Sequence, residues 1–119
     1  MIFELTDEQK LVQETAREFA HNDIAPTLVE EEKNHEFRLD RVARMGELGF
    51  FSCGVPEALG GTGFGFMESV LMAEQIARVS ASWRLPFNMQ NLGPALTVAK
   101  FGTAAQKQQF IPGWVAGTQ

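Results

Sequence analysis

The sequence has few of the residues that mark secreted, membrane-spanning or nucleic-acid-binding proteins. Its single cysteine, Cys53, cannot form an intrachain disulfide, and with no His or Lys beside it we interpret it as a small buried apolar residue. No window approaches the roughly 18–20 apolar residues of a membrane span, and the N-terminus lacks the pattern of a secretory signal. Lys and Arg total 10 against 15 acidic residues and do not cluster, so nucleic acid is not an expected partner. We expect a soluble protein of a reducing compartment, either the bacterial cytoplasm or the mitochondrial matrix.

Metal ligands and nucleophilic motifs are equally scarce. His21 and His35 are isolated, with no second His or Cys at metal spacing, and we expect the first on a helix surface and the second in a loop. The run Glu30-Glu31-Glu32 predicts a solvated helix face and no metal site, because consecutive helical residues point about 100° apart. No catalytic triad is visible, so we expect no catalytic residue in this chain.

The pattern that is present predicts an all-α domain spanning residues 1–119. Thr6-Asp7-Glu8-Gln9 and Thr103-Ala104-Ala105-Gln106 are capping boxes that open helices. Pro26 is expected to kink the first helix or to occupy the first turn of the next one. No stretch shows the two-residue alternation of a strand. We therefore predict a bundle of five or six short helices.

Two helical stretches have apolar residues at the spacing of one buried face. The predicted face residues of the first are Leu39, Val42, Met45 and Leu48, and those of the second are Met67, Val70, Leu71, Ile76 and Ala77. A further apolar helix is expected from just after Ser82 to Gly102, and the last helix is expected to be disturbed at Pro112.

Five glycines and one proline between Phe50 and Phe66 predict a loop between helices. The segment Gly60-Gly61-Thr62-Gly63 invites a phosphate-binding interpretation, but its spacing matches neither the dinucleotide motif nor the P-loop, and no strand precedes it. Glycines that supply positive φ in a tight turn are the simpler interpretation.

Arg84 is the candidate that stands out. It lies in the most apolar and aromatic helical stretch of the chain, and no acidic residue is near it in the sequence. Such an arginine either extends to the surface, pairs with a distant acid, or binds the carboxylate of a ligand through a bidentate contact.

The order of these features resembles the N-terminal domain of acyl-CoA dehydrogenases over essentially the whole chain. The resemblance is carried by these segments: Leu5-Thr6-Asp7-Glu8-Gln9, Ala25-Pro26, Glu47-Leu48-Gly49-Phe50, Val55-Pro56-Glu57-Ala58-Leu59-Gly60-Gly61-Thr62-Gly63, Glu74-Gln75-Ile76-Ala77 and Phe101-Gly102-Thr103-Ala104-Ala105-Gln106-Lys107.

Within that family the sequence is most similar to glutaryl-CoA dehydrogenases. The resemblance implies that Arg84 pairs with the terminal carboxylate of the glutaryl chain and that Asn88, one turn later, lines the same pocket. Members that act on plain fatty acyl chains lack this arginine, so the position separates dicarboxylyl from monocarboxylyl substrates.

The resemblance also implies a larger FAD-dependent enzyme that introduces an α,β double bond into an acyl-CoA. Its base glutamate is expected in a C-terminal helical domain, and its flavin in that domain and a middle β-domain; both are absent here, so this chain alone should be inactive. A homotetramer that passes electrons to an electron-transfer flavoprotein is expected. The last helix ends close to Gln119, which we interpret as a cut at a domain boundary. A non-catalytic interaction module and a flavin-dependent oxidase or monooxygenase of the same superfamily remain alternatives.

Overall fold

The computed structural model describes residues 3–119, and every regular element in that range is helical, which confirms the predicted all-α fold. The α-helices are α1 (Asp7–Phe19), α2 (Leu28–Lys33), α3 (Leu39–Glu47), α4 (Phe66–Val79), α5 (Ala81–Gln90), α6 (Leu96–Phe101) and α7 (Ala104–Ala116). Two π-helical turns, Ala20–Ile24 and Asn91–Ala95, extend α1 and join α5 to α6, and a 3-10 turn, Glu57–Leu59, lies in the glycine-rich loop. No helix in this range is long and apolar enough to cross a membrane.

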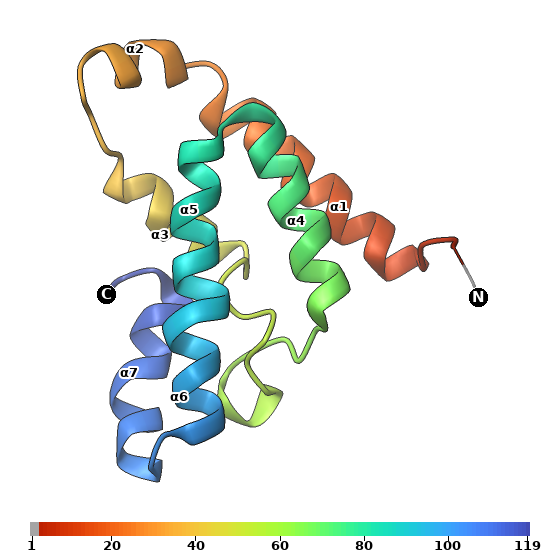
Figure 1. The fold of residues 1–119 in the computed structure, drawn as a ribbon, viewed down its shortest axis with the longest axis vertical. Coiled ribbons are helices and arrows are strands. Elements are labelled where there is room, and N and C mark those ends of the chain that lie inside the picture. Colours follow the sequence, from red (N-terminus) through yellow and green to blue (C-terminus); the bar gives the residue numbers. More distant parts are fainter. Residues whose placement is uncertain (1–2) are drawn as a thin grey trace.

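The molecule is flat, with extents of 42 × 39 × 18 Å. Helices α1 and α4 pack along each other, and α5 follows α4 after a sharp corner (Figure 1). The continuous stretch from α5 through α6 then runs down to α7, while the short α2 projects from the opposite end of the molecule. Apolar side chains on α5 and α6, Leu85, Met89 and Phe101, remain exposed in this arrangement.

The helix ends confirm the capping predictions and correct the prediction for Pro26. Thr6 Oγ1 accepts the Gln9 N–H at 3.1 Å while Gln9 Oε1 accepts the Thr6 N–H at 3.1 Å, and Thr103 forms the same reciprocal pair with Gln106. Pro26 neither kinks the first helix nor enters α2, because it lies in the turn before the cap residue Thr27. A proline cannot donate the helical hydrogen bond and its ring crowds the preceding turn, so the helix ends ahead of it.

The apolar core has two parts. The larger part lies among α1, α3, α4 and α5, and its buried members are Ala16, Phe19, Ala20, Ile24, Met45, Phe50, Phe51, Cys53, Met72, Ile76, Trp83 and Phe87. The smaller part comprises Val55, Ala95 and Ile111, and joins the glycine-rich loop to the π-turn and α7. The larger part packs against α5, and the smaller part packs against the second π-turn and α6.

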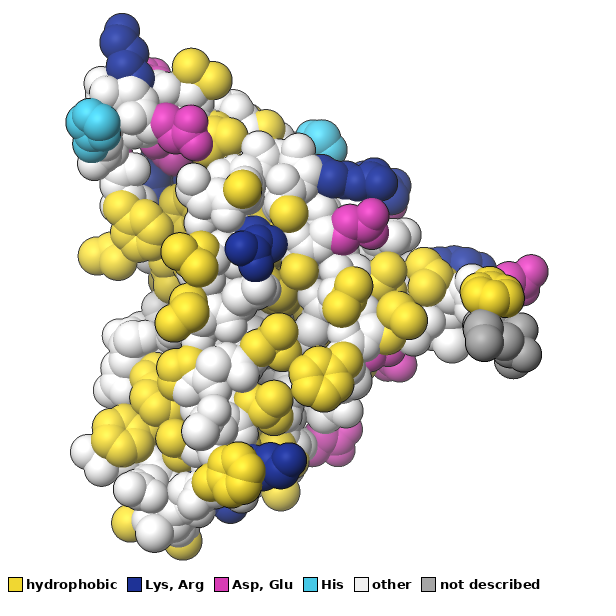
Figure 2. All heavy atoms as spheres, in the orientation of Figure 1, with side chains coloured by type: hydrophobic (Ala, Val, Ile, Leu, Met, Phe, Trp, Pro, Cys, Tyr) yellow, Lys and Arg dark blue, Asp and Glu magenta, His cyan; other side chains and the backbone are white. Residues whose placement is uncertain are grey.

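Several predicted burial assignments are wrong. Glu31 is buried, whereas the sequence predicted a solvated glutamate run, because Arg41 reaches it from α3. Leu39, which begins α3, is 73% exposed, and Met67 and Val70 of α4 are 53% and 59% exposed. Helix α4 does bury two of its predicted face residues, Leu71 and Ile76, and with them Ser69, Met72 and Gln75. Apolar side chains are therefore spread over one open face of the molecule, which Figure 2 shows.

Candidate functional site

Arg84 lies in the first turn of α5, which is held by the cap residue Ser80. Ser80 Oγ accepts the Trp83 N–H at 3.2 Å, and the Ser80 carbonyl accepts the Arg84 N–H at 3.2 Å. The Arg84 side chain is half-buried, and within residues 3–119 it has neither an ion pair nor a side-chain hydrogen bond. An internal acidic partner, one of the three possibilities left by the sequence, is therefore not found in the described part of the chain. The N–H donors of the Arg84 guanidinium are therefore not used by any described side chain or carbonyl.

Asn88 and Asn91 bring unpaired acceptors to the same helix. Asn88 lies one turn after Arg84, and its Oδ1 is buried without a hydrogen-bond partner. Asn91 is fully buried; its Nδ2 donates to Ser69 Oγ at 3.2 Å, but its Oδ1 is also unpaired. Buried acceptors without a donor are rare and costly, so each calls for an explanation such as a ligand or a bound water. Asn91 was missed in the sequence, where its position three residues after Asn88 on an apolar helix was the available signal.

The π-turn changes which residues share a face with Arg84. An α-helix advances about 100° per residue, so in a straight helix Leu96 would point roughly 120° away from Arg84. A π-helical turn accommodates one extra residue, which reduces that offset to about 20°. Pro94 lies in this turn and cannot donate a backbone hydrogen bond, which favours the wider geometry. Arg84, Asn88 and Leu96 are therefore expected along one stripe of the continuous helix.

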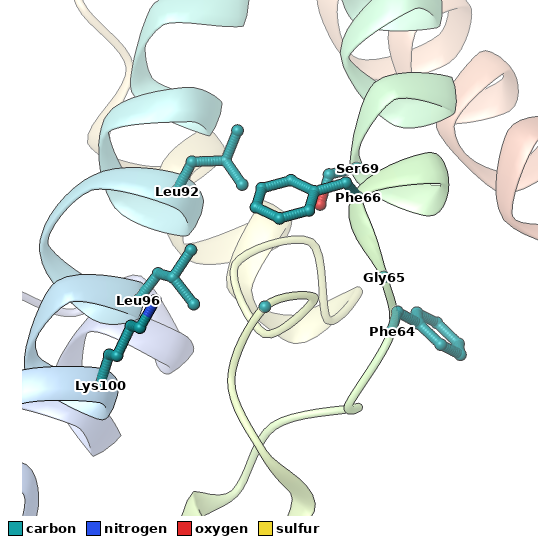
Figure 3. Close-up of a pocket in the computed structure, with 8 residues that line it drawn as sticks. Phe64, Gly65, Phe66, Ser69, Leu92, Leu96 and Lys100 are labelled. Carbon is teal, nitrogen blue, oxygen red and sulfur yellow. The ribbon is translucent and has the colours of Figure 1, made fainter.

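An apolar cavity of about 210 Å³ lies at the lower end of this stripe. Leu92 and Leu96 line it from one side, and Phe66 and Ser69 line it from the start of α4. In Figure 3 the Phe66 ring points across the cavity toward Leu92, whereas Phe64 points away. Ser69 is almost completely buried and is the group to which Asn91 donates, so the asparagine contacts the cavity wall from behind. The stripe thus combines the Arg84 cation, the Asn88 amide and an apolar cavity.

The glycine-rich loop has a structural role. The N–H groups of residues 60–63 donate to the carbonyls of Glu57, Pro56, Ser52 and Val55 respectively, so they are not free to bind a phosphate. Gly60 has φ +86°, and a Cβ on Gly61 would lie 1.8 Å from the Val55 carbonyl oxygen. These positions require glycine for the turn itself, as the simpler interpretation predicted.

The remaining candidate residues do not form a site. Burial raises the pKa of Cys53 to about 11, which keeps the thiol protonated and unreactive. His21 and His35 are both exposed, the first on a helical turn and the second in the loop after α2. Among residues 3–119 no group of three His, Cys, Asp or Glu side chains could hold a metal ion.

Comparison with known proteins places this geometry in a family. Residues 6–118 match the family described as "Acyl-CoA dehydrogenase, N-terminal domain". The chain belongs to this family. Two curated relatives are glutaryl-CoA dehydrogenase of Desulfococcus multivorans, 35% identical over 94% of the chain and 30% of the relative, and bovine (Bos taurus) mitochondrial short-chain specific acyl-CoA dehydrogenase, 35% identical over 96% and 28%.

Solved structures agree with this acyl-CoA dehydrogenase assignment. A glutaryl-CoA dehydrogenase in complex with glutaryl-CoA has a TM-score of 0.93 and 34% identity over 98% of the chain and 30% of that protein. A structure from work on the electron transferring flavoprotein of Acidaminococcus fermentans has a TM-score of 0.93 and 31% identity, over 99% and 31%. The chain therefore spans about 30% of the length of these acyl-CoA dehydrogenase relatives.

Proposed function

We propose that this chain is the N-terminal domain of a larger FAD-dependent acyl-CoA dehydrogenase whose substrate has a second carboxylate, as glutaryl-CoA does. The observation that carries the substrate class is Arg84, a half-buried cation without a protein partner among residues 3–119. A buried or half-buried arginine is normally paired, and a carboxylate matches its planar fork through two parallel hydrogen bonds. The exposed apolar side chains of α4 to α6 support a larger enzyme, since such patches usually contact other parts of a protein.

In this proposal the domain binds the substrate and other domains perform the redox chemistry. The dehydrogenation removes an α-proton and a β-hydride as the carbon–carbon double bond forms, and FAD would supply the hydride acceptor. The glycine-rich loop does not fit a flavin cradle, because the N–H groups of residues 60–63 are already bonded within the loop. We therefore propose that the flavin and the base glutamate belong to a middle β-domain and a C-terminal helical domain.

Asn88 complements Arg84 in the binding of the distal carboxylate. Its Nδ2 can donate to a carboxylate oxygen that is already paired with the guanidinium. Further along the same continuous helix, the cavity wall at Leu92 and Leu96 is apolar, whereas Arg84 is charged. A substrate chain that ends in a methyl group would leave the guanidinium unpaired, so the arrangement favours dicarboxylyl over monocarboxylyl thioesters.

An electron-transfer flavoprotein is the proposed electron acceptor, and a homotetramer is the proposed assembly. The likeness to a structure from work on such a flavoprotein supports the first of these. Oxygen consumption in place of electron transfer would instead favour the oxidase or monooxygenase alternative.

Substitution of Arg84 in the full-length enzyme tests the proposal. Arg84→Ala should lower kcat/KM for glutaryl-CoA by on the order of 100-fold or more, because a charge-assisted bidentate contact to a desolvated partner is lost. Turnover of butyryl-CoA should change little. Arg78→Ala is the matched control, since Arg78 lies exposed on α4 and pairs with Glu74 at 3.4 Å. Equal losses on both substrates would mean that Arg84 is structural.

A further inference from the structure

The side chain that precedes Arg84 is fixed by residues outside its own helix. Trp83 is 4% exposed, and the Arg41 guanidinium of α3 lies 4.5 Å from the centroid of its ring. The Phe37 ring, in the loop before α3, stacks on the same indole with centroids 5.0 Å apart and an interplanar angle of 11°. The segment 37–41, distant in sequence from α5, therefore packs against the first turn of α5 through Trp83.

Arg41 is itself held by three hydrogen bonds from its two terminal nitrogens. Its Nη1 donates to Glu31 Oε2 at 2.6 Å, and its Nη2 donates to Glu31 Oε1 at 2.7 Å and to Thr27 Oγ1 at 3.0 Å. Thr27 Oγ1 in turn donates to Glu31 Oε1 at 2.5 Å. Both side chains of the ion pair are only 5% exposed. The guanidinium plane is therefore fixed by bonds at its edge while its face lies against Trp83.

Stability alone does not account for this ion pair. Well-packed apolar residues in place of a buried ion pair are often as stable or more stable, whereas a buried pair can fix the geometry of neighbouring elements. Only a guanidinium can form a bidentate contact with a carboxylate and stack on an indole at the same time. Trp83 and Arg84 are consecutive residues in the first turn of α5, so a fixed Trp83 side chain constrains the backbone that carries Arg84.

We propose that Arg41 is a positioning residue for Arg84. Paired with Glu31 and stacked on Trp83, it fixes the rotation of the first turn of α5 so that the Arg84 guanidinium meets the distal carboxylate of the substrate. This inference rests on the proposed function of Arg84. It adds that the α2–α3 corner, formed by Thr27, Glu31 and Arg41, controls substrate selection. Small displacements matter here, since a misplacement of about 1 Å can cost roughly 100-fold in rate.

The test is a double variant of the full-length, flavin-loaded enzyme, Glu31→Leu with Arg41→Met. Removal of both charges avoids an unpaired buried ion, so the protein should fold. The KM for glutaryl-CoA should rise roughly tenfold or more while kcat and KM for butyryl-CoA stay near their wild-type values. The matched control is Glu47→Leu with Arg44→Met, which removes an exposed pair from the same helix at 3.0 Å. This control should leave kcat and KM for both substrates unchanged.

A second variant covers a failure of the double variant to fold. Trp83→Leu keeps the Glu31–Arg41 pair but removes the ring that connects it to α5, and it should raise the KM for glutaryl-CoA selectively as well. Unchanged KM values for glutaryl-CoA, or equal losses on both substrates, would overturn the positioning role.

Arg84→Ala in the same assays separates this inference from the proposed function. A selective loss in Arg84→Ala without one in the variants of the α2–α3 corner would reject only the positioning role of Arg41. Equal losses on both substrates in Arg84→Ala would reject the proposed function, and the positioning role with it.

Discussion

Two arginines of this domain enter apolar surroundings in opposite ways. Arg41, at the α2–α3 corner, is 5% exposed and meets a carboxylate, a hydroxyl and an aromatic face. Arg84, on α5, is half-buried beside an asparagine whose acceptor is unpaired, and it has no partner among residues 3–119. The Arg41 charge therefore has its partners within the fold. The Arg84 guanidinium has no ion-pair partner among residues 3–119 and can bind a carboxylate from outside, which is why we assign the ligand to α5 and not to the α2–α3 corner.

The largest effect expected from this contrast is on folding stability. Arg41→Met removes the bidentate partner of the buried Glu31 carboxylate. The Thr27 hydroxyl and a longer contact to Arg38 at 3.6 Å remain, so the free energy of unfolding should fall by about 3 kcal/mol. Arg84→Met removes no ion pair or side-chain hydrogen bond found among residues 3–119, and it should change the free energy of unfolding by less than about 0.5 kcal/mol. Urea unfolding followed by circular dichroism measures both. Comparable losses in the two variants would show that Arg84 is also paired within the fold.

A second effect concerns pH. The hydrogen bonds from Arg41 lower the pKa of the Glu31 carboxyl, and they outweigh the opposing effect of burial. A lowered folded-state pKa means that the pair stabilises the fold fully above the ordinary value of 4.5 and that this contribution is lost as the pH falls through the folded-state pKa.

The unfolding free energy of the wild type should therefore fall more steeply below pH 4.5 than that of the Glu31→Leu, Arg41→Met double variant. Asp40 and Glu68 also have lowered pKa values, and they contribute to the loss of stability at low pH in both proteins. An identical fall in unfolding free energy at low pH in the two proteins would contradict a lowered pKa for Glu31.

The sequence predicted most of the fold because helix signals are local. Capping boxes at Thr6 and Thr103 and the glycine-rich loop depend on residues within a few positions of one another, and the structure has each of them. The burial of Glu31 could not be predicted, since it depends on an arginine ten residues away that reaches back from the next helix. Likewise, periodicity cannot show which face of α4 is covered, and Met67 and Val70 lie on the open one.

The candidate site was only partly visible in the sequence. Arg84 was singled out because a cation in an apolar helix is unusual, and Asn88 because of the family resemblance. The π-turn Asn91–Ala95 was not foreseen, although Gly93 and Pro94 mark it in retrospect. A one-residue change of helical register depends on how two helix ends pack against the rest of the domain, and no local pattern determines it.

The smallest predicted effect tests whether Asn88 is kept for binding at the expense of stability. Its buried Oδ1 has no donor, so Asn88→Leu should raise the free energy of unfolding by about 1 kcal/mol. Asn22→Leu is the control, because this exposed asparagine gains helix propensity without relief of a buried acceptor. The same Asn88→Leu change should raise the KM for glutaryl-CoA in the full-length enzyme, since a donor to the carboxylate is lost. Lower stability of Asn88→Leu than of the wild type would show that the asparagine is satisfied within the fold, and the contrast between the paired corner and the unpaired helix face would then fail at this residue.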